Sequence, residues 1–68
     1  MRDFREFLND FYNDKADLGL FTTKNEKDED VIIEITNNYL KTSTIQNNGW
    51  MRINIYHKDK TAEEYYEK

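Results

Sequence analysis

The chain has 68 residues, which leaves room for one domain over residues 1–68, since autonomous domains run from about 50 to 250 residues. It contains no cysteine, which excludes disulfide bonds and thiolate zinc sites and fits a reducing, cytoplasmic compartment. A formal net charge of -4 counts against direct nucleic-acid binding, whose affinity comes chiefly from lysine and arginine on phosphates. We expect no membrane association, because no apolar run approaches the roughly 20 residues that span a bilayer.

The first residues have the spacing of an amphipathic helix. Apolar side chains recur at positions i, i+3, i+4 and i+7, namely Phe4, Phe7, Leu8 and Phe11. Asp3 and Glu6 are placed as a capping box at its start. The pattern therefore predicts a helix over residues 3–14.

The next segments carry weaker signals. Residues 18–23 fit either a short strand or a loop tucked against the helix, since their threonines and apolar residues permit both. Residues 24–30 are almost wholly charged and have no periodic apolar face, which predicts an exposed loop.

From Val31 onward the apolar period changes to two, which is typical of strands. Two-residue turns are predicted at Asn37-Asn38, Asn48-Gly49 and Asp59-Lys60. The predicted class is α+β, with the N-terminal helix packed on one face of a four-stranded antiparallel β-meander and residues 18–23 as a candidate extra strand.

Two-residue turns also fix a register, in which Ile35 pairs with Leu40, Thr44 with Ile53, and Ile53 with Tyr66. The face toward the helix is then expected to hold Val31, Ile33, Ile35, Leu40, Met51, Ile53, Ile55, Ala62 and Tyr66. The opposite face is expected to hold Ile32, Glu34, Lys41, Ile45, Trp50, Arg52, Asn54, Tyr56, Glu63, Tyr65 and Glu67.

Tryptophan, tyrosine and arginine are enriched at binding hot spots, and this register gathers them on the uncovered face. The predicted partner-binding residues are Trp50, Arg52, Tyr56, Tyr65, Ile45 and Lys41. The alternative is that the aromatic residues serve strand formation, with Arg52 merely stacked on Trp50 or Tyr56.

A second candidate surface is acidic: Asp10, Asp14, Asp17, Glu26, Asp28, Glu29 and Asp30. Dense carboxylates can imitate a phosphate track and occupy the basic groove of a nucleic-acid-binding protein. The alternative is ordinary solubilising charge. A calcium site is not expected, because the EF-hand pattern is absent.

Catalysis is not expected, and neither a metal site nor a cofactor is predicted. In the proposed register Ser43 and His57, the single serine and histidine, lie on opposite faces and cannot act as nucleophile and base. The two glycines form no phosphate-cradling loop.

The small size, the missing cysteine and the abundance of Asn, Lys, Asp, Glu and Ile resemble in general style the compact accessory proteins of phages and mobile elements, including inhibitors of bacterial defence systems. The sequence therefore favours a non-catalytic protein-protein interaction module or inhibitor of a host protein. One alternative is a structural homodimer formed through the exposed sheet face. Another is an aromatic platform for a nucleotide-type ligand, with Arg52 or Lys41 on the phosphate.

Overall fold

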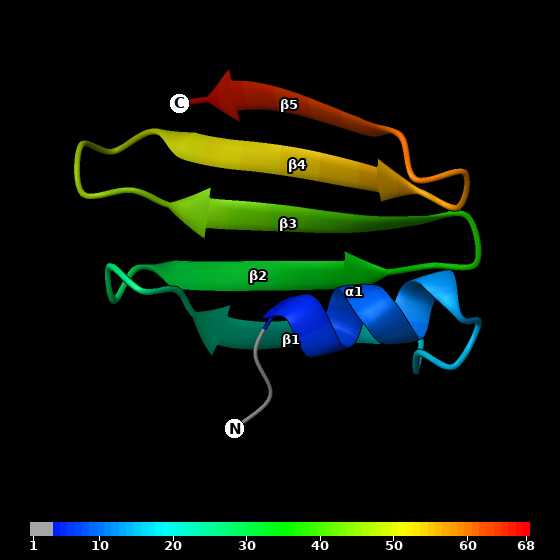
Figure 1. Cartoon of the computed structure of the whole chain (residues 1–68). Coiled ribbons are helices and arrows are strands. Elements are labelled where there is room, and N and C mark those ends of the chain that lie inside the picture. Colours follow the sequence, from blue (N-terminus) through cyan, green and yellow to red (C-terminus); the bar gives the residue numbers. More distant parts are fainter. Residues whose placement is uncertain (1–3) are drawn as a thin grey trace.

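The computed structural model describes residues 4–68 and consists of one helix and one antiparallel sheet. Helix α1 spans Phe4–Tyr12, and the strands are β1 (Gly19–Lys24), β2 (Asp30–Ile35), β3 (Tyr39–Ile45), β4 (Met51–His57) and β5 (Ala62–Glu67). The sheet order is β1-β2-β3-β4-β5, so each strand pairs with its neighbour in the chain (Figure 1). The α+β class is confirmed, with five strands in place of four.

The N-terminal helix is shorter than predicted. It ends at Tyr12, and Asp14 then adopts a positive φ of 57°, a left-handed conformation that cannot continue a right-handed helix. Asp3, half of the predicted capping box, lies outside the described residues. Residues 18–23, left open between strand and loop, lie almost wholly within β1, and the charged segment that follows forms the β1–β2 connection.

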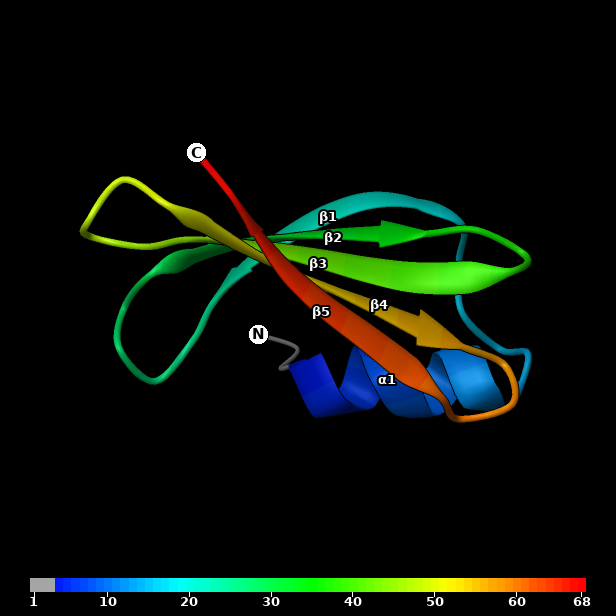
Figure 2. The same cartoon turned by 90° about the horizontal axis from the view of Figure 1, so that it is seen from above.

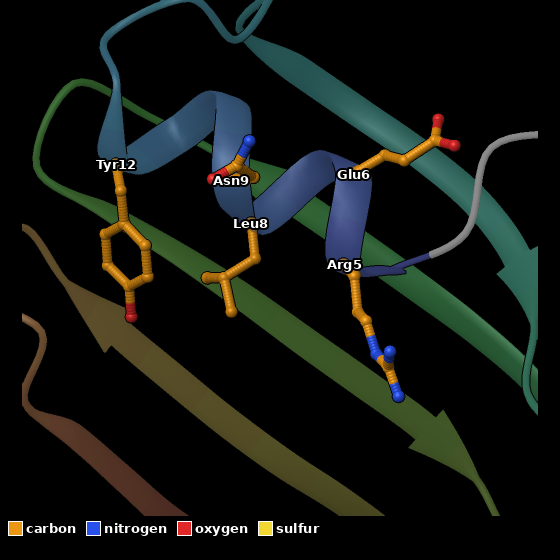
Figure 3. Close-up of a pocket in the computed structure, with 5 residues that line it drawn as sticks. All are labelled: Arg5, Glu6, Leu8, Asn9 and Tyr12. Carbon is orange, nitrogen blue, oxygen red and sulfur yellow. The ribbon is translucent and has the colours of Figure 1, made fainter.

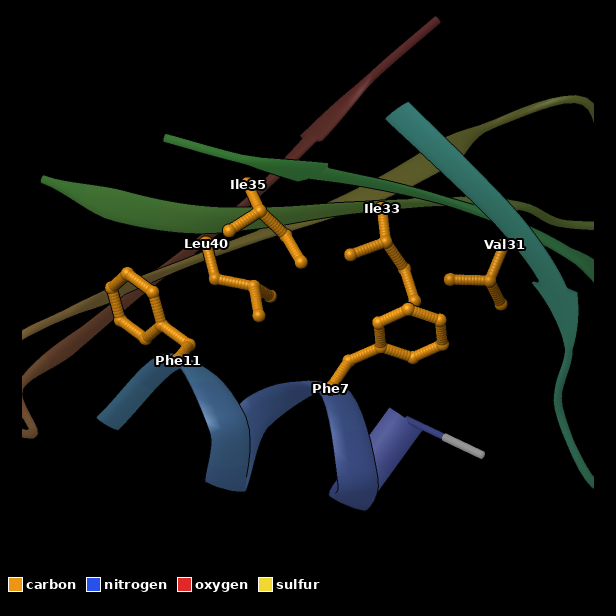
Figure 4. Close-up of a cluster of buried hydrophobic side chains, with 6 residues drawn as sticks. All are labelled: Phe7, Phe11, Val31, Ile33, Ile35 and Leu40. Carbon is orange, nitrogen blue, oxygen red and sulfur yellow. The ribbon is translucent and has the colours of Figure 1, made fainter. Parts of the chain in front are cut away.

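Helix α1 lies against one face of the sheet (Figure 2). Phe7 and Phe11 project from α1 onto side chains of β2 and β3, as Figure 4 shows. The buried cluster consists of Phe7, Phe11, Val31, Ile33, Ile35 and Leu40. β1 also contributes, because the Phe21 ring lies 5.3 Å from the Phe7 ring. The predicted packing of the Phe-rich helix on the sheet is thus confirmed.

The β2–β3 hairpin has the predicted two-residue turn. The Thr36 amide donates to the Tyr39 carbonyl at 2.9 Å, closing the loop around Asn37-Asn38. Ile35 lies opposite Leu40, as expected.

The β3–β4 hairpin differs from the prediction by one residue. The Gln46 amide donates to the Trp50 carbonyl at 3.0 Å, which leaves the three residues 47–49 in the loop. Gly49 has a φ of 89°, which matches the left-handed residue that ends a three-residue hairpin loop. Thr44 consequently faces Arg52, so the predicted pairing of Thr44 with Ile53 is wrong.

The β4–β5 hairpin contains the same one-residue difference. The His57 amide donates to the Thr61 carbonyl, and Lys60 adopts the left-handed conformation with a φ of 69°. Ile53 therefore faces Tyr65 and not Tyr66. Because the two shifts cancel, β5 keeps its predicted orientation and β4 alone is turned over.

The turned β4 corrects the predicted faces. Met51, Ile53 and Ile55, expected beneath the helix, share a face with Ser43 and Tyr65 on the side away from α1. Arg52, Asn54 and Tyr56, expected on the exposed side, lie on the helix side opposite Thr44, Thr42 and Leu40. The Tyr56 ring accordingly contacts the Phe4 ring of α1, with 5.4 Å between centroids.

Candidate functional site

The face of the sheet away from α1, called the outer face below, carries a continuous apolar patch. Its middle row crosses four strands through direct pairs: Ile32 with Ser43, Ser43 with Ile53, and Ile53 with Tyr65. Beside it, Ile45 pairs with Met51. The patch consists of Ile32, Ile45, Met51, Ile53, Ile55 and Tyr65. Leu20 and Tyr39 share the outer face but lie outside the patch, where they pair with Glu34 and His57.

Exposure varies across this patch. Ile53, at its centre, is 1% exposed although it stands outside the cluster that packs on α1. Around it, Ile32, Ile45 and Tyr65 are 37%, 44% and 39% exposed. The patch therefore has a buried centre and partly exposed surroundings, and no part of residues 4–68 forms a layer over it (Figure 2).

Charged side chains surround the patch. One row of paired residues crosses the sheet through Leu20, Glu34, Lys41, Ile55 and Glu63. Its charged members are Glu34, Lys41 and Glu63. Carboxylates also stand at Asp30 and Glu67, which pair with Lys24 and Met51. Lys24 forms an ion pair with Asp30 at 3.4 Å, and the hydrogen bond with Asp30 raises the pKa of Lys24 above its ordinary value.

The predicted partner-binding residues do not form one surface. Ile45, Lys41 and Tyr65 lie on the outer face, as expected. Arg52 and Tyr56 lie on the helix side, so they are separated from those three by the thickness of the sheet.

Trp50 lies outside β4 in the hairpin, where it is 40% exposed and the Lys68 ammonium is 5.5 Å from its ring centroid. Sequence reasoning did not select Ile32, and it placed Met51, Ile53 and Ile55 on the wrong side. The sequence carried no decisive signal for the correct side, because Gly49 fits the last position of a three-residue loop as well as the second position of a two-residue turn.

The predicted acidic surface is divided between two ends of the molecule. Asp10, Asp14 and Asp17 lie in or just after α1, whereas Glu26, Asp28, Glu29 and Asp30 lie at the β1–β2 connection, at the far end of β1 (Figure 1). Several of these carboxylates have partners within the chain. Asp14 accepts a hydrogen bond from Lys58 at 2.6 Å, and Glu29 accepts one from Asn25 at 2.9 Å. The seven residues therefore form no single acidic track.

The pair considered for catalysis is also placed differently. Ser43 and His57 both lie on the outer face, not on opposite faces. His57 follows the partner of Ser43 by four residues along β4, which separates them by about 13 Å. The His57 ring contacts Glu63 at 2.9 Å instead.

Within residues 4–68, no group of three or more histidine, cysteine, aspartate or glutamate residues could hold a metal ion. The helix that the structure describes is too short and too polar to cross a membrane.

An open depression of about 490 Å³ lies beside α1, lined by Arg5, Glu6, Leu8, Asn9 and Tyr12. Figure 3 shows that Arg5, Leu8 and Tyr12 extend from one side of the helix, whereas Glu6 points away from them. The described residues that line it all come from α1, so among them no polar groups converge from separate elements, as they typically do in ligand sites.

Comparisons with protein-family models, curated proteins and solved structures find no match to the chain.

Proposed function

We propose that the chain is a small, non-catalytic binding protein that docks onto a protein partner through the outer face of its sheet. One observation carries the proposal: six apolar side chains from β2, β3, β4 and β5 are contiguous on a face that the helix does not cover. Contiguous exposed apolar surface on a small domain marks an interaction site more often than isolated apolar side chains do.

The layout of the outer face also supports docking. Its centre, around Ile53, is apolar and desolvated, and its border carries charged side chains. Protein interfaces typically have such an apolar centre and polar rim, with tyrosine among the residues that contribute most to affinity. Tyr65 is the aromatic residue within the patch.

The charges around the patch favour a basic partner over a second copy of the chain. The border contains four carboxylates, Asp30, Glu34, Glu63 and Glu67, against two lysines, Lys24 and Lys41. Two copies stacked through this face would bring acidic borders together, and like charges across an interface oppose association. The homodimer is therefore the less favoured occupant.

A basic, nucleic-acid-binding host protein has the complementary charge. The composition favours one specific function of this kind, that of an inhibitor acting in the cytoplasm, such as those that phages and mobile elements encode. The separation of Ser43 from His57 supports a role without catalysis.

The proposal is tested by comparing two exposed apolar positions. The wild-type chain, Ile45→Glu and Leu18→Glu are each immobilised and exposed to extract of the encoding cell, and any retained protein is identified and purified for a binding titration. Ile45 is on the outer face, whereas Leu18 is 56% exposed in the loop before β1. Circular dichroism first establishes that both variants are folded.

We expect the wild type and Leu18→Glu to bind the same protein with equal affinity and Ile45→Glu to lose it. Equal binding by Ile45→Glu would contradict the outer-face assignment. Sedimentation at micromolar concentration is expected to show a monomer. A dimer that Ile45→Glu dissociates would instead assign the outer face to self-association.

A further inference from the structure

Two adjoining cavities open on the helix side of the sheet, at the N-terminal end of α1. The outer one, of about 580 Å³, is lined by Phe4, Arg5, Lys24, Asn25, Glu26, Lys27 and Arg52. The inner one, of about 140 Å³, is lined by Phe4, Asn25, Val31, Thr42, Thr44, Arg52, Asn54 and Tyr56. Phe4, Asn25 and Arg52 belong to both, so the two form one continuous site, called the Arg52 site below.

Positive charge gathers at this site although the chain is acidic overall. Among the described lining residues, Arg5, Lys24, Lys27 and Arg52 stand against one carboxylate, Glu26. Lys24 is engaged by Asp28 and Asp30, at 3.7 Å and 3.4 Å. Within the described part of the chain, Arg5, Lys27 and Arg52 form no ion pair. Three cations from three separate elements thus remain available to a ligand.

Arg52 is the clearest sign of a missing partner. Its Nε is buried and has no hydrogen-bond partner among residues 4–68. A buried donor of a charged group without a partner is costly, and an anion bound beside it would remove that cost. The position follows from the turned β4, which places Arg52 opposite Thr44 beneath the N-terminal end of α1.

The inner cavity has a different character. Phe4 and Val31 supply apolar walls, while Thr42, Thr44 and Asn54 can hydrogen-bond to a ligand. The Tyr56 hydroxyl, like an ordinary tyrosine hydroxyl, is protonated at neutral pH. Burial is the main cause that raises its pKa further above the ordinary value. These groups suit an uncharged, polar organic moiety.

We propose that the Arg52 site binds a small phosphorylated ligand, with the phosphate among Arg5, Lys27 and Arg52 and the uncharged moiety in the inner cavity. A phosphate fits better than a single carboxylate, because its oxygens point in several directions and can meet cations that come from α1, the β1–β2 connection and β4. The site lies on the opposite side of the sheet from the proposed docking surface, so either proposal can fail without the other.

The test is an NMR titration with three probes at matched ionic strength: inorganic phosphate, adenosine 5′-monophosphate and adenosine. We expect saturable shifts of the Arg52 Nε–H signal and of the Asn25 and Lys27 amides with both phosphorylated probes. Adenosine 5′-monophosphate is expected to bind more tightly than inorganic phosphate and to shift Thr42 and Asn54 as well. Adenosine alone is expected to bind more weakly than its monophosphate.

Variants separate the site from general charge effects. Arg52→Gln and the exposed Arg5→Gln are each expected to weaken binding of adenosine 5′-monophosphate by about tenfold, the effect of losing one hydrogen bond to a charged group. Lys15→Gln removes the same charge beyond the other end of α1 and is expected to leave the affinity unchanged. Because Arg5 is on the surface, its variant remains informative if Arg52→Gln is unfolded.

The proposal would be overturned by shifts that chloride reproduces at the same ionic strength, or by no saturable shift with either phosphorylated probe. Equal weakening by Lys15→Gln would also overturn it, because the effect would then reflect net charge. Equal affinities for inorganic phosphate and adenosine 5′-monophosphate would overturn the assignment of the inner cavity.

Discussion

Lys58, in the β4–β5 hairpin, donates hydrogen bonds to the Asp14 carboxylate and to the Phe11 carbonyl at the C-terminal end of α1. Its ammonium group also lies 4.1 Å from the centroid of the Phe11 ring. A cation at this position interacts favourably with the last carbonyls of the helix and with the negative end of the helix dipole. One side chain therefore ties the last hairpin to the first element of the chain.

Replacing Lys58 with methionine is expected to lower the free energy of unfolding by about 1 kcal/mol, since the apolar stem remains and the helix-end contacts are lost. Urea unfolding followed by circular dichroism measures the change. Lys15→Met is the matched control, because it removes the same charge close to the same helix end without these hydrogen bonds. An equal loss in both variants would show that net charge, and not the contact, is responsible.

Gly49 tests the left-handed backbone conformation in the β3–β4 loop. Its φ is 89°, and a Cβ added there would meet nothing within 4 Å, so any cost of substitution comes from the backbone conformation alone. Gly49→Ala is expected to destabilise the fold by about 1 kcal/mol. Gly49→Asn is expected to cost less, because asparagine tolerates the left-handed region better. Equal stability of the two variants in urea would contradict the assigned loop geometry.

The register of β4 can be tested by crosslinking, because the chain has no cysteine of its own. Ile45 lies directly opposite Met51, so the pair Ile45→Cys and Met51→Cys is expected to oxidise readily to a disulfide. Ile45→Cys with Arg52→Cys would be opposite one another in the register expected from two-residue turns and is predicted to keep free thiols. Thiol titration after mild oxidation distinguishes the two. Faster oxidation of the second pair would contradict the observed register and favour the one expected from two-residue turns.

The protonation of the Asp59 carboxylate is coupled to the stability of the β4–β5 turn. It accepts hydrogen bonds from the Thr61 hydroxyl and amide, and these lower the pKa of Asp59 below its ordinary value. Its stabilising effect is therefore complete above the ordinary carboxylate pKa and is lost as pH falls through the lowered pKa. Carbon-13 NMR is expected to show that Thr61→Val raises the pKa of Asp59, while Thr22→Val on the outer face leaves it unchanged. A pKa unaffected by Thr61→Val would contradict this cause.

Much of the fold follows from local pattern. The spacing of Phe4, Phe7 and Phe11 predicts the helix and its buried side, and Asn37-Asn38 fixes the β2–β3 pairing. Both signals depend on residues close in sequence, and the structure confirms both. Residues 18–23 stayed undecided because their strand is defined by pairing with β2, which local composition does not encode.

The candidate site was only partly predictable for a physical reason. A loop of three residues differs from one of two by a single peptide unit, but the period of a strand is two, so that unit reverses every side chain that follows. Both faces of β4 contain apolar or aromatic residues, Ile53 and Ile55 on one and Tyr56 on the other, so hydrophobicity alone could not reveal the reversal. The loop-closing hydrogen bonds, from the Gln46 amide to the Trp50 carbonyl and from the His57 amide to the Thr61 carbonyl, reveal it.

The orientation of β4 divides the hydrophobic side chains of a very small protein between two sides of one sheet. Ile53 and Ile55 lie on the face away from α1 and do not contribute to the hydrophobic core beneath the helix. The isolated chain therefore has a smaller core than its number of isoleucines would allow. Any molecule that binds over those isoleucines in the folded state alone would stabilise the fold, and the melting temperature would rise with the logarithm of its concentration once that concentration exceeds the Kd. The thermal stability of this protein is thus expected to depend on whether a partner is bound to the outer face.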